Sequence, residues 1–93
     1  MADFVWDPTK ARANLVKHGI DFEAAKTVFL DPAAIFEPDD SDPDEERWRA
    51  IGLADGRLLF VVFTERDDDV TRIISARKAN KREERAYLGQ ATP

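Results

Sequence analysis

The chain has 93 residues, a hydrophobic fraction of 43%, a formal net charge of −5 and no cysteine. This length supports one small domain, and the lack of cysteine excludes a disulfide-dependent fold and a cysteine-rich metal site. Its longest apolar run, residues 58–63, is too short to cross a bilayer, and the N-terminus lacks the basic-then-apolar pattern of a secretion signal. We therefore expect a single cytoplasmic domain over residues 1–93.

The N-terminal part predicts a short strand followed by two helices. Residues 4–6 are suited to an edge strand. Asp7 and the proline after it are typical of a helix start, with Asp as the N-cap. Gly19 is placed to end this helix, and Asp21 can cap a second helix that begins at Phe22.

The rest of the chain predicts strands and a final helix. Strands are expected at residues 33–36, 47–53, 58–63 and 70–76. Asp55-Gly56 predicts a tight turn, and short connections make the last three strands an antiparallel meander. Asn80 with Glu83 three residues later is a capping box that opens a helix ending near Gly89. The expected class is α+β: two N-terminal helices, an antiparallel sheet of about four strands, an N-terminal edge strand as an optional fifth, and a C-terminal helix.

Residues 38–45 predict an acidic loop. Its aspartates have the spacing that begins a calcium-binding loop. However, Glu45 stands where that loop needs glycine, and Ile51 stands where it needs glutamate. The sequence therefore predicts a solvated loop and no metal site.

Basic residues gather where the last strand gives way to the last helix. Regular alternation along residues 70–77 places Arg72 and Arg77 on opposite faces, so the two are not expected to serve one site. Arg47 and Arg49 share one face of an earlier strand, with Trp48 on the other. Either Arg47 lies near the residues that follow Phe63 or near the end of the last strand, or the charges protect an edge strand from aggregation.

The last helix carries its own cations. Lys78, Arg82 and Arg85 have spacings of four and three, which would place them on one helical face. Lys81 and Arg82 in the first turn oppose the helix dipole at a cost of about 0.3–1 kcal/mol each. This pattern favours either an external anion or a solvated face balanced by the neighbouring glutamates.

His18 is the only histidine in the chain and lies between Lys17 and Gly19. Gly19 leaves the helix, and cations are favoured at the negative C-terminal pole. His18 is therefore either a structural part of the helix end, or a general acid or phosphate contact.

Four blocks of sequence together resemble the BrnT family of toxins of type II toxin–antitoxin systems. These are FVWDPTKARANLVKHGIDFEAA, EERWRAIG, GRLLFVVFTER and RIISARKANKREERAY, in this order over residues 4–87. The resemblance implies a small α+β fold similar to RelE-type ribonucleases, with RNA as substrate, RNA cleavage and growth arrest. It also implies a BrnA-type antitoxin with a ribbon-helix-helix DNA-binding domain, so that operator DNA is bound only through the complex. A homodimer and a heterotetramer with the antitoxin both stay open.

The matching blocks also imply site residues. Lys17 and His18 match the family's Lys-His-Gly block, Glu46 and Arg47 its Glu-Arg pair, and Arg77 and Lys78 its basic strand end. Metal-independent cleavage through the RNA 2′-hydroxyl needs no cofactor, but it needs a base, an acid and cations for the phosphorane charge.

On this scheme, His18 and Glu46 are the expected acid/base pair, and Arg77 and Arg47 complete the catalytic set. Lys17, Lys78, Lys81 and Arg82 are expected RNA contacts. The alternative is a non-catalytic RNA- or protein-binding subunit of a toxin–antitoxin repressor complex. Since the chain is acidic overall, the loop at 38–45 must face away from RNA or engage a basic segment of the antitoxin.

Overall fold

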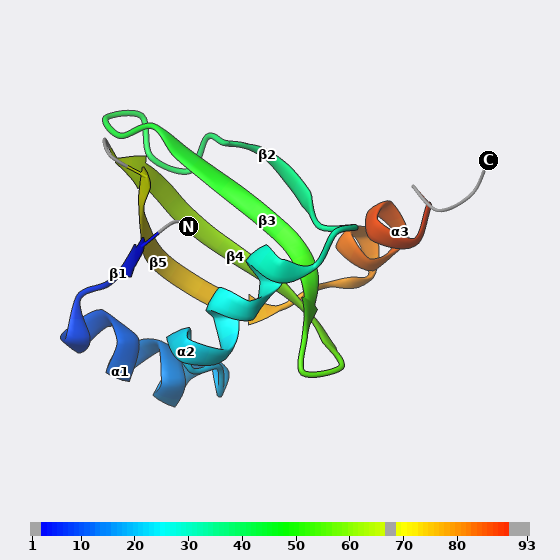
Figure 1. Ribbon diagram of the computed structural model, residues 1–93, viewed down its shortest axis with the longest axis horizontal. Coiled ribbons are helices and arrows are strands. Elements are labelled where there is room, and N and C mark those ends of the chain that lie inside the picture. The colour runs from blue at the N-terminus through cyan, green and yellow to red at the C-terminus, as the bar shows by residue number, and fades with distance from the viewer. Residues whose placement is uncertain (1–2, 67–68, 90–93) are drawn as a thin grey trace.

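The computed structural model describes residues 3–66 and 69–89, which form five strands and three α-helices (Figure 1). The chain order is β1 (Asp3–Val5), α1 (Pro8–His18), α2 (Phe22–Ala25), the 3₁₀ segment η1 (Lys26–Leu30), β2 (Ile35–Asp39), β3 (Arg47–Ala54), β4 (Arg57–Arg66), β5 (Val70–Lys78) and α3 (Lys81–Gly89). The α+β class and the C-terminal helix are confirmed. The predicted second helix is a four-residue α-helix that continues as η1.

The ends of the N-terminal helices form where the sequence predicts them. The Asp7 carboxylate accepts a hydrogen bond from the Thr9 N–H at 2.8 Å, and α1 ends at Gly19, whose φ is 71°. The Asp21 carboxylate accepts the Glu23 N–H at 2.9 Å in the same way. Each contact satisfies a backbone group that a helix end leaves without an intrahelical partner.

The predicted capping box and hairpin turn are also present. The Asn80 side-chain oxygen accepts the Glu83 N–H at 2.8 Å, and the Glu83 carboxylate accepts the Asn80 N–H at 2.8 Å. Between β3 and β4, Asp55 and Gly56 have φ values of 52° and 76°, as a tight two-residue hairpin requires. These local features depend only on neighbours in sequence.

The sheet is mixed, with the strand order β1-β5-β4-β3-β2. The expected edge strand forms and pairs parallel to β5, whereas the other pairs are antiparallel. Several strand bounds differ from the prediction because pairing with long neighbours extends them. Pro38 and Asp39 belong to β2 and not to the acidic loop, and Lys78 belongs to β5. The expectation that Lys78 shares a helical face with Arg82 and Arg85 is therefore wrong.

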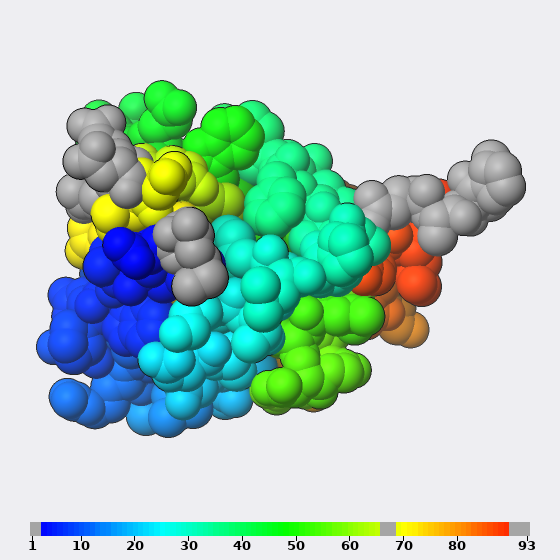
Figure 2. All heavy atoms as spheres, in the orientation of Figure 1, coloured from blue at the N-terminus to red at the C-terminus, as the bar shows by residue number. Residues whose placement is uncertain are grey.

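One face of the sheet is covered by α1, α2 and η1, which appear blue to cyan in Figure 2. Side chains from β4, β5 and these helices are fully buried between them, among them Phe22, Val28, Leu59, Val61 and Ile73. Gly52 allows η1 to approach β3, because a Cβ there would lie 2.9 Å from Val28. None of the helices in the described segments is long and apolar enough to cross a membrane.

A β-bulge interrupts β5. Ile73 is paired with Phe63 and Ser75 with Val62, so Ile74 has no partner on β4. Two residues of β5 therefore occupy the space of one, and the alternation of side chains changes phase at this point.

The bulge changes which arginines share a face. Arg72 is opposite Thr64 and Arg77 is opposite Phe60. Thr64 and Phe60 are four residues apart on β4 and point to the same side. The expectation that Arg72 and Arg77 lie on opposite faces is therefore wrong, because it assumed a regular strand.

Asn14 fastens α1 to the part of β5 that β1 does not cover. Its amide nitrogen donates to the carbonyls of Ala76 at 2.8 Å and Ile20 at 2.9 Å, and its oxygen accepts the Ala76 N–H at 3.1 Å. Asn14 is 7% exposed. Its side chain therefore makes the hydrogen bonds that a neighbouring strand would otherwise make with these buried backbone groups.

Candidate functional site

Four arginines whose side chains the structure describes lie on the face of the sheet opposite α1 and α2, and we call it the arginine face. Arg47 and Arg49 come from β3, whereas Arg72 and Arg77 come from β5. Glu37 of β2 is directly opposite Arg49. The prediction that Arg47 and Arg49 share a face is confirmed, because their alternate neighbour Trp48 packs against the core on the other side.

A groove of about 430 Å³ lies between the arginine face and α3, and we call it the α3 groove. Its polar lining comes from Glu37, Arg49, Arg77, Asn80, Arg82 and Glu83. Ile51, Phe60 and Ala86 supply apolar surface. The groove thus combines cations, carboxylates and an aromatic ring in one concave surface.

Arg77 is held in one orientation. Its two terminal nitrogens donate to the two carboxylate oxygens of Glu83 at 2.8 and 2.9 Å. The guanidinium carbon lies 4.0 Å from the ring centroid of Phe60. A bidentate pair together with an aromatic stack fixes the plane of the guanidinium, which is the geometry suited to a phosphate.

Glu83 links Arg77 to the start of α3. Burial alone would raise the pKa of Glu83, but the hydrogen bonds from Arg77 and from the Asn80 N–H outweigh it and hold the pKa below its ordinary value. The Glu83 side chain is 14% exposed, so the ionised carboxylate is largely screened from water. The capping box therefore also positions the arginine.

Arg49 and Arg47 are paired with carboxylates too. Arg49 donates to Glu37 at 3.1 Å and lies 3.5 Å from Asp39. The hydrogen bond from Arg49 to Glu37 raises the pKa of Arg49, despite burial that opposes it.

Arg47 lies at the other end of the arginine face. Its side chain is 2.9 Å from Glu45 and 3.4 Å from Asp42, so the acidic loop folds back onto it. Arg47, Arg49 and Arg77 are therefore each neutralised by the chain itself.

The predicted site residues do not all meet in the α3 groove. Arg77 and Arg82 line it, whereas Arg47 belongs to the arginine face beside the acidic loop. Lys78 follows Arg77 directly in β5, so its side chain lies on the other side of the sheet. Lys81 is exposed on α3.

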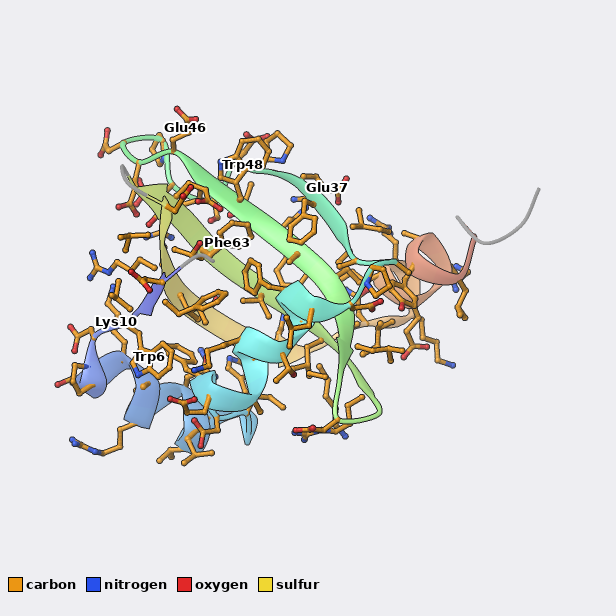
Figure 3. The ribbon with its side chains drawn as sticks, in the orientation of Figure 1. Trp6, Lys10, Glu37, Glu46, Trp48 and Phe63 are labelled. Carbon is orange, nitrogen blue, oxygen red and sulfur yellow. The ribbon has the colours of Figure 1, made fainter. Side chains whose placement is uncertain are left out.

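Glu46 is also outside the groove. Figure 3 shows it standing out from the loop end of β3, whereas Glu37 lies farther along β2 toward α3. The carboxylates that line the groove are Glu37 and Glu83.

Lys17 and His18 lie in a second concavity of about 220 Å³, between α1 and β5, which we call the α1 depression. Lys10 joins them from one helical face, and Ile74 and Ser75 contribute from the bulge. The structure thus brings the helix-end pair to β5, in a cavity separate from the one that Arg77 lines.

Comparison with known proteins identifies the family of this chain. The family model described as the BrnT ribonuclease toxin of type II toxin–antitoxin systems matches residues 6–83. The chain belongs to the BrnT family. A crystal structure of the Brucella abortus ribonuclease toxin BrnT is similar, with a TM-score of 0.71 and 30% sequence identity over 87% of this chain and 100% of that one. No curated protein sequence matches.

Two groove residues of this BrnT-family chain did not stand out in the sequence as members of a site. Glu37 meets Arg49 only through the register of β2 against β3, which the sequence does not reveal. The sequence predicts Glu83 as part of a helix cap, but its contact with Arg77 depends on how α3 turns back toward β5. Within the described segments, no group of three or more His, Asp or Glu side chains is placed to hold a metal ion.

Proposed function

We propose that this BrnT-family chain cleaves RNA in the α3 groove, without a metal ion, through the RNA's own 2′-hydroxyl. The observation that carries the proposal is the convergence of Arg49 and Arg77, both oriented by carboxylates, on one groove. The phosphorane formed during cleavage bears more negative charge than the starting phosphodiester. Guanidinium groups fixed beforehand stabilise that charge without reorganising during the reaction.

The lining suggests how RNA binds. The Phe60 ring lies under Arg77 and is partly exposed, so an aromatic surface adjoins the cation proposed to hold the phosphate. Stacking and phosphate contacts together are the common mode of single-strand recognition.

We propose Glu37 as the general base. The Glu83 oxygens already accept three hydrogen bonds, two from Arg77 and one from the Asn80 N–H. Glu37 accepts one, from Arg49, and its side chain is 43% exposed. Glu37 therefore has free lone pairs for the 2′-hydroxyl proton. The 2′-oxygen then bonds to phosphorus, the bond to the 5′-oxygen breaks, and that oxygen takes a proton from water. The products are a 2′,3′-cyclic phosphate and a 5′-hydroxyl.

A catalytic role for His18, Arg47 and Glu46 stays a prediction of the sequence. Their placement outside the α3 groove supports contacts with RNA away from the cleaved bond.

The proposal extends to a partner. As a member of a toxin–antitoxin family, the chain is expected to be neutralised by an antitoxin, and we propose a BrnA-type protein with a ribbon-helix-helix domain that alone contacts operator DNA. Covering the arginine face would block RNA. RNA as the substrate supports a cytoplasmic location for this activity.

The test is cleavage of a defined RNA by purified protein in EDTA, with product ends analysed. Arg77→Ala should lower the rate by about 10²–10³-fold, because one preorganised contact to the transition state is lost. Arg85→Ala is the matched control, since Arg85 is exposed on the same helix and does not line the groove.

Folding of each variant is checked by circular dichroism. A folded Arg77→Ala with wild-type activity would overturn the site. Wild-type protein that binds RNA without cutting it would favour the alternative, a non-catalytic binding subunit. Activity that EDTA abolishes would contradict the metal-free chemistry.

A further inference from the structure

We infer that the α1 depression is a second phosphate site, which holds the RNA backbone away from the bond that is cut. The inference rests on the proposed function, because it takes RNA as the substrate of the α3 groove. It assigns Lys10, Lys17 and His18 to binding rather than to chemistry.

The lining of the depression supplies cations without internal carboxylates. Lys10 and Lys17 are seven residues apart, two helical turns, so both project from one side of α1, and His18 adjoins them. Within residues 3–66 and 69–89, none of the three takes part in an ion pair. The helix itself contains no Asp or Glu. A phosphate entering the depression therefore displaces no carboxylate.

The helix α1, which carries the cations of the depression, is fixed against the sheet. The three hydrogen bonds of Asn14 fix α1 against the backbone of Ala76 and Ile20, and Asn14 itself forms part of the floor. Cations on a fixed helix lose less freedom when a ligand binds than cations on a loop.

The β5 bulge connects the depression to the arginine face. Ser75 is opposite Val62, which places it on the same side of the sheet as Arg77, and it also lines the depression. Ser75 is two positions before Arg77 on β5, which corresponds to a rise of about 6.6 Å along the strand. A strand of RNA held at Arg77 thus reaches the depression by continuing along β5.

The size of the depression favours a phosphodiester over a protein partner. A volume of about 220 Å³ accommodates one phosphate with part of its sugar. A stable protein interface buries roughly 800 Å² on each partner and centres on apolar or aromatic anchors. Ala13 and Ile74 are the apolar side chains among the described residues that line the depression, and none of these residues is Phe, Tyr or Trp.

The first measurement is binding of the intact chain to a 2′-O-methyl RNA, which keeps the phosphates but lacks the nucleophile. Fluorescence anisotropy over a series of salt concentrations gives the slope of log affinity against log salt. Lys10→Gln and Lys17→Gln should each reduce the magnitude of this slope by about 0.7, the value for one lost contact to a single strand. Arg12→Gln is the matched control: it removes the same charge from the opposite side of α1 and should change the slope much less.

The second measurement is steady-state cleavage of a long RNA and of a dinucleotide. Lys10→Gln, Lys17→Gln and His18→Gln should raise KM for long RNA several-fold, and the penalty should shrink for the dinucleotide, which cannot span both sites. Equal slopes for Lys10→Gln and Arg12→Gln would overturn the inference. So would loss of kcat on the dinucleotide in His18→Gln, which would make His18 catalytic.

Two outcomes separate this inference from the proposed function. If wild-type protein cuts no RNA while the salt slopes change as expected, the depression is a phosphate site and the proposed chemistry fails. If RNA is cut but the salt slopes do not change, cleavage in the α3 groove is retained as the function and the depression does not bind RNA. Substitutions that weaken binding of an acidic antitoxin while leaving RNA affinity intact would also contradict the inference.

Discussion

The α3 groove and the α1 depression both contain cations, yet only the groove has cations that the chain pairs with carboxylates within the described segments. Arg49 and Arg77 each lie against a carboxylate, whereas Lys10, Lys17 and His18 form no ion pair within the described segments. The two regions are therefore suited to different tasks. Paired guanidinium groups are oriented in advance, and unpaired ammonium groups attract any anion over a distance set by salt.

This difference also predicts how each region responds to conditions. The Arg77 side chain is 35% exposed and its partner Glu83 is 14% exposed, so the pair is only partly screened by salt. The cations of the depression lie at the surface, where screening is strongest. High salt should thus weaken RNA capture before it disturbs the geometry of the groove.

The largest expected effect concerns Asn14, which fixes α1 against β5 at the depression. Asn14→Ala should lower the free energy of unfolding by about 2–4 kcal/mol, because the buried N–H and C=O of Ala76 lose their partners. Urea denaturation measures this change. Asn80→Ala is the comparison: it removes an exposed helix cap beside the groove and should cost about 1 kcal/mol. Equal costs would show that α1 is not fixed by the Asn14 amide.

A smaller effect concerns pH and the groove. The folded pKa of Glu83 lies below its ordinary value of 4.5, so its ionised form stabilises the fold above that pH. The contribution is lost as pH falls through the folded pKa. Glu83→Gln should therefore lower the free energy of unfolding by about 1 kcal/mol near neutral pH, a value that allows for the partial exposure of Arg77. The difference from wild type should vanish at low pH.

Urea denaturation between pH ~7 and ~3 checks the Glu83 prediction. Glu84→Gln serves as control, because Glu84 is the exposed neighbour and forms no ion pair in the described part of the chain. A difference between Glu83→Gln and wild type that stays constant down to the acid limit would argue against the Arg77 pair as its source.

The smallest expected effect comes from removing the carboxylates that pair with Arg47, which would leave it unpaired like the cations of the depression. Asp42→Asn with Glu45→Gln frees Arg47 and should tighten RNA binding about two- to fivefold, in keeping with the small value of exposed ion pairs. Asp40→Asn with Asp44→Asn changes the net charge of the same segment equally, and neither residue is paired with an arginine in the described part of the chain. If both double variants tighten binding alike, general charge and not the pairing is responsible.

The sequence predicted the features that depend on near neighbours. Asp7, Gly19, Asp21 and the Asn80–Glu83 box all act within four residues, and all form as expected. Helix ends and tight turns are local problems in hydrogen bonding and backbone conformation, which composition and spacing can describe.

The sequence could not predict contacts between segments that are far apart in the chain. Asn14 gave no signal, because its partner Ala76 is 62 residues away. The pairing of Glu37 with Arg49 follows from strand register, and a one-residue slip would have separated them. No glycine marks the bulge at Ile74, so regular alternation was the natural and incorrect assumption. The family resemblance is confirmed, whereas the roles of its matching residues await the substitutions described above.

The bulge also affects how related sequences should be aligned. Five positions separate Arg72 from Arg77, an odd interval that in an unbroken strand would turn the two arginines away from each other. Here the odd interval is what brings them to one side. The interval between the two arginines therefore carries as much information as their identity. A relative that kept both arginines at this interval but lacked the bulge would have the same residues on opposite faces, whereas one that lost the extra residue would keep both on one side.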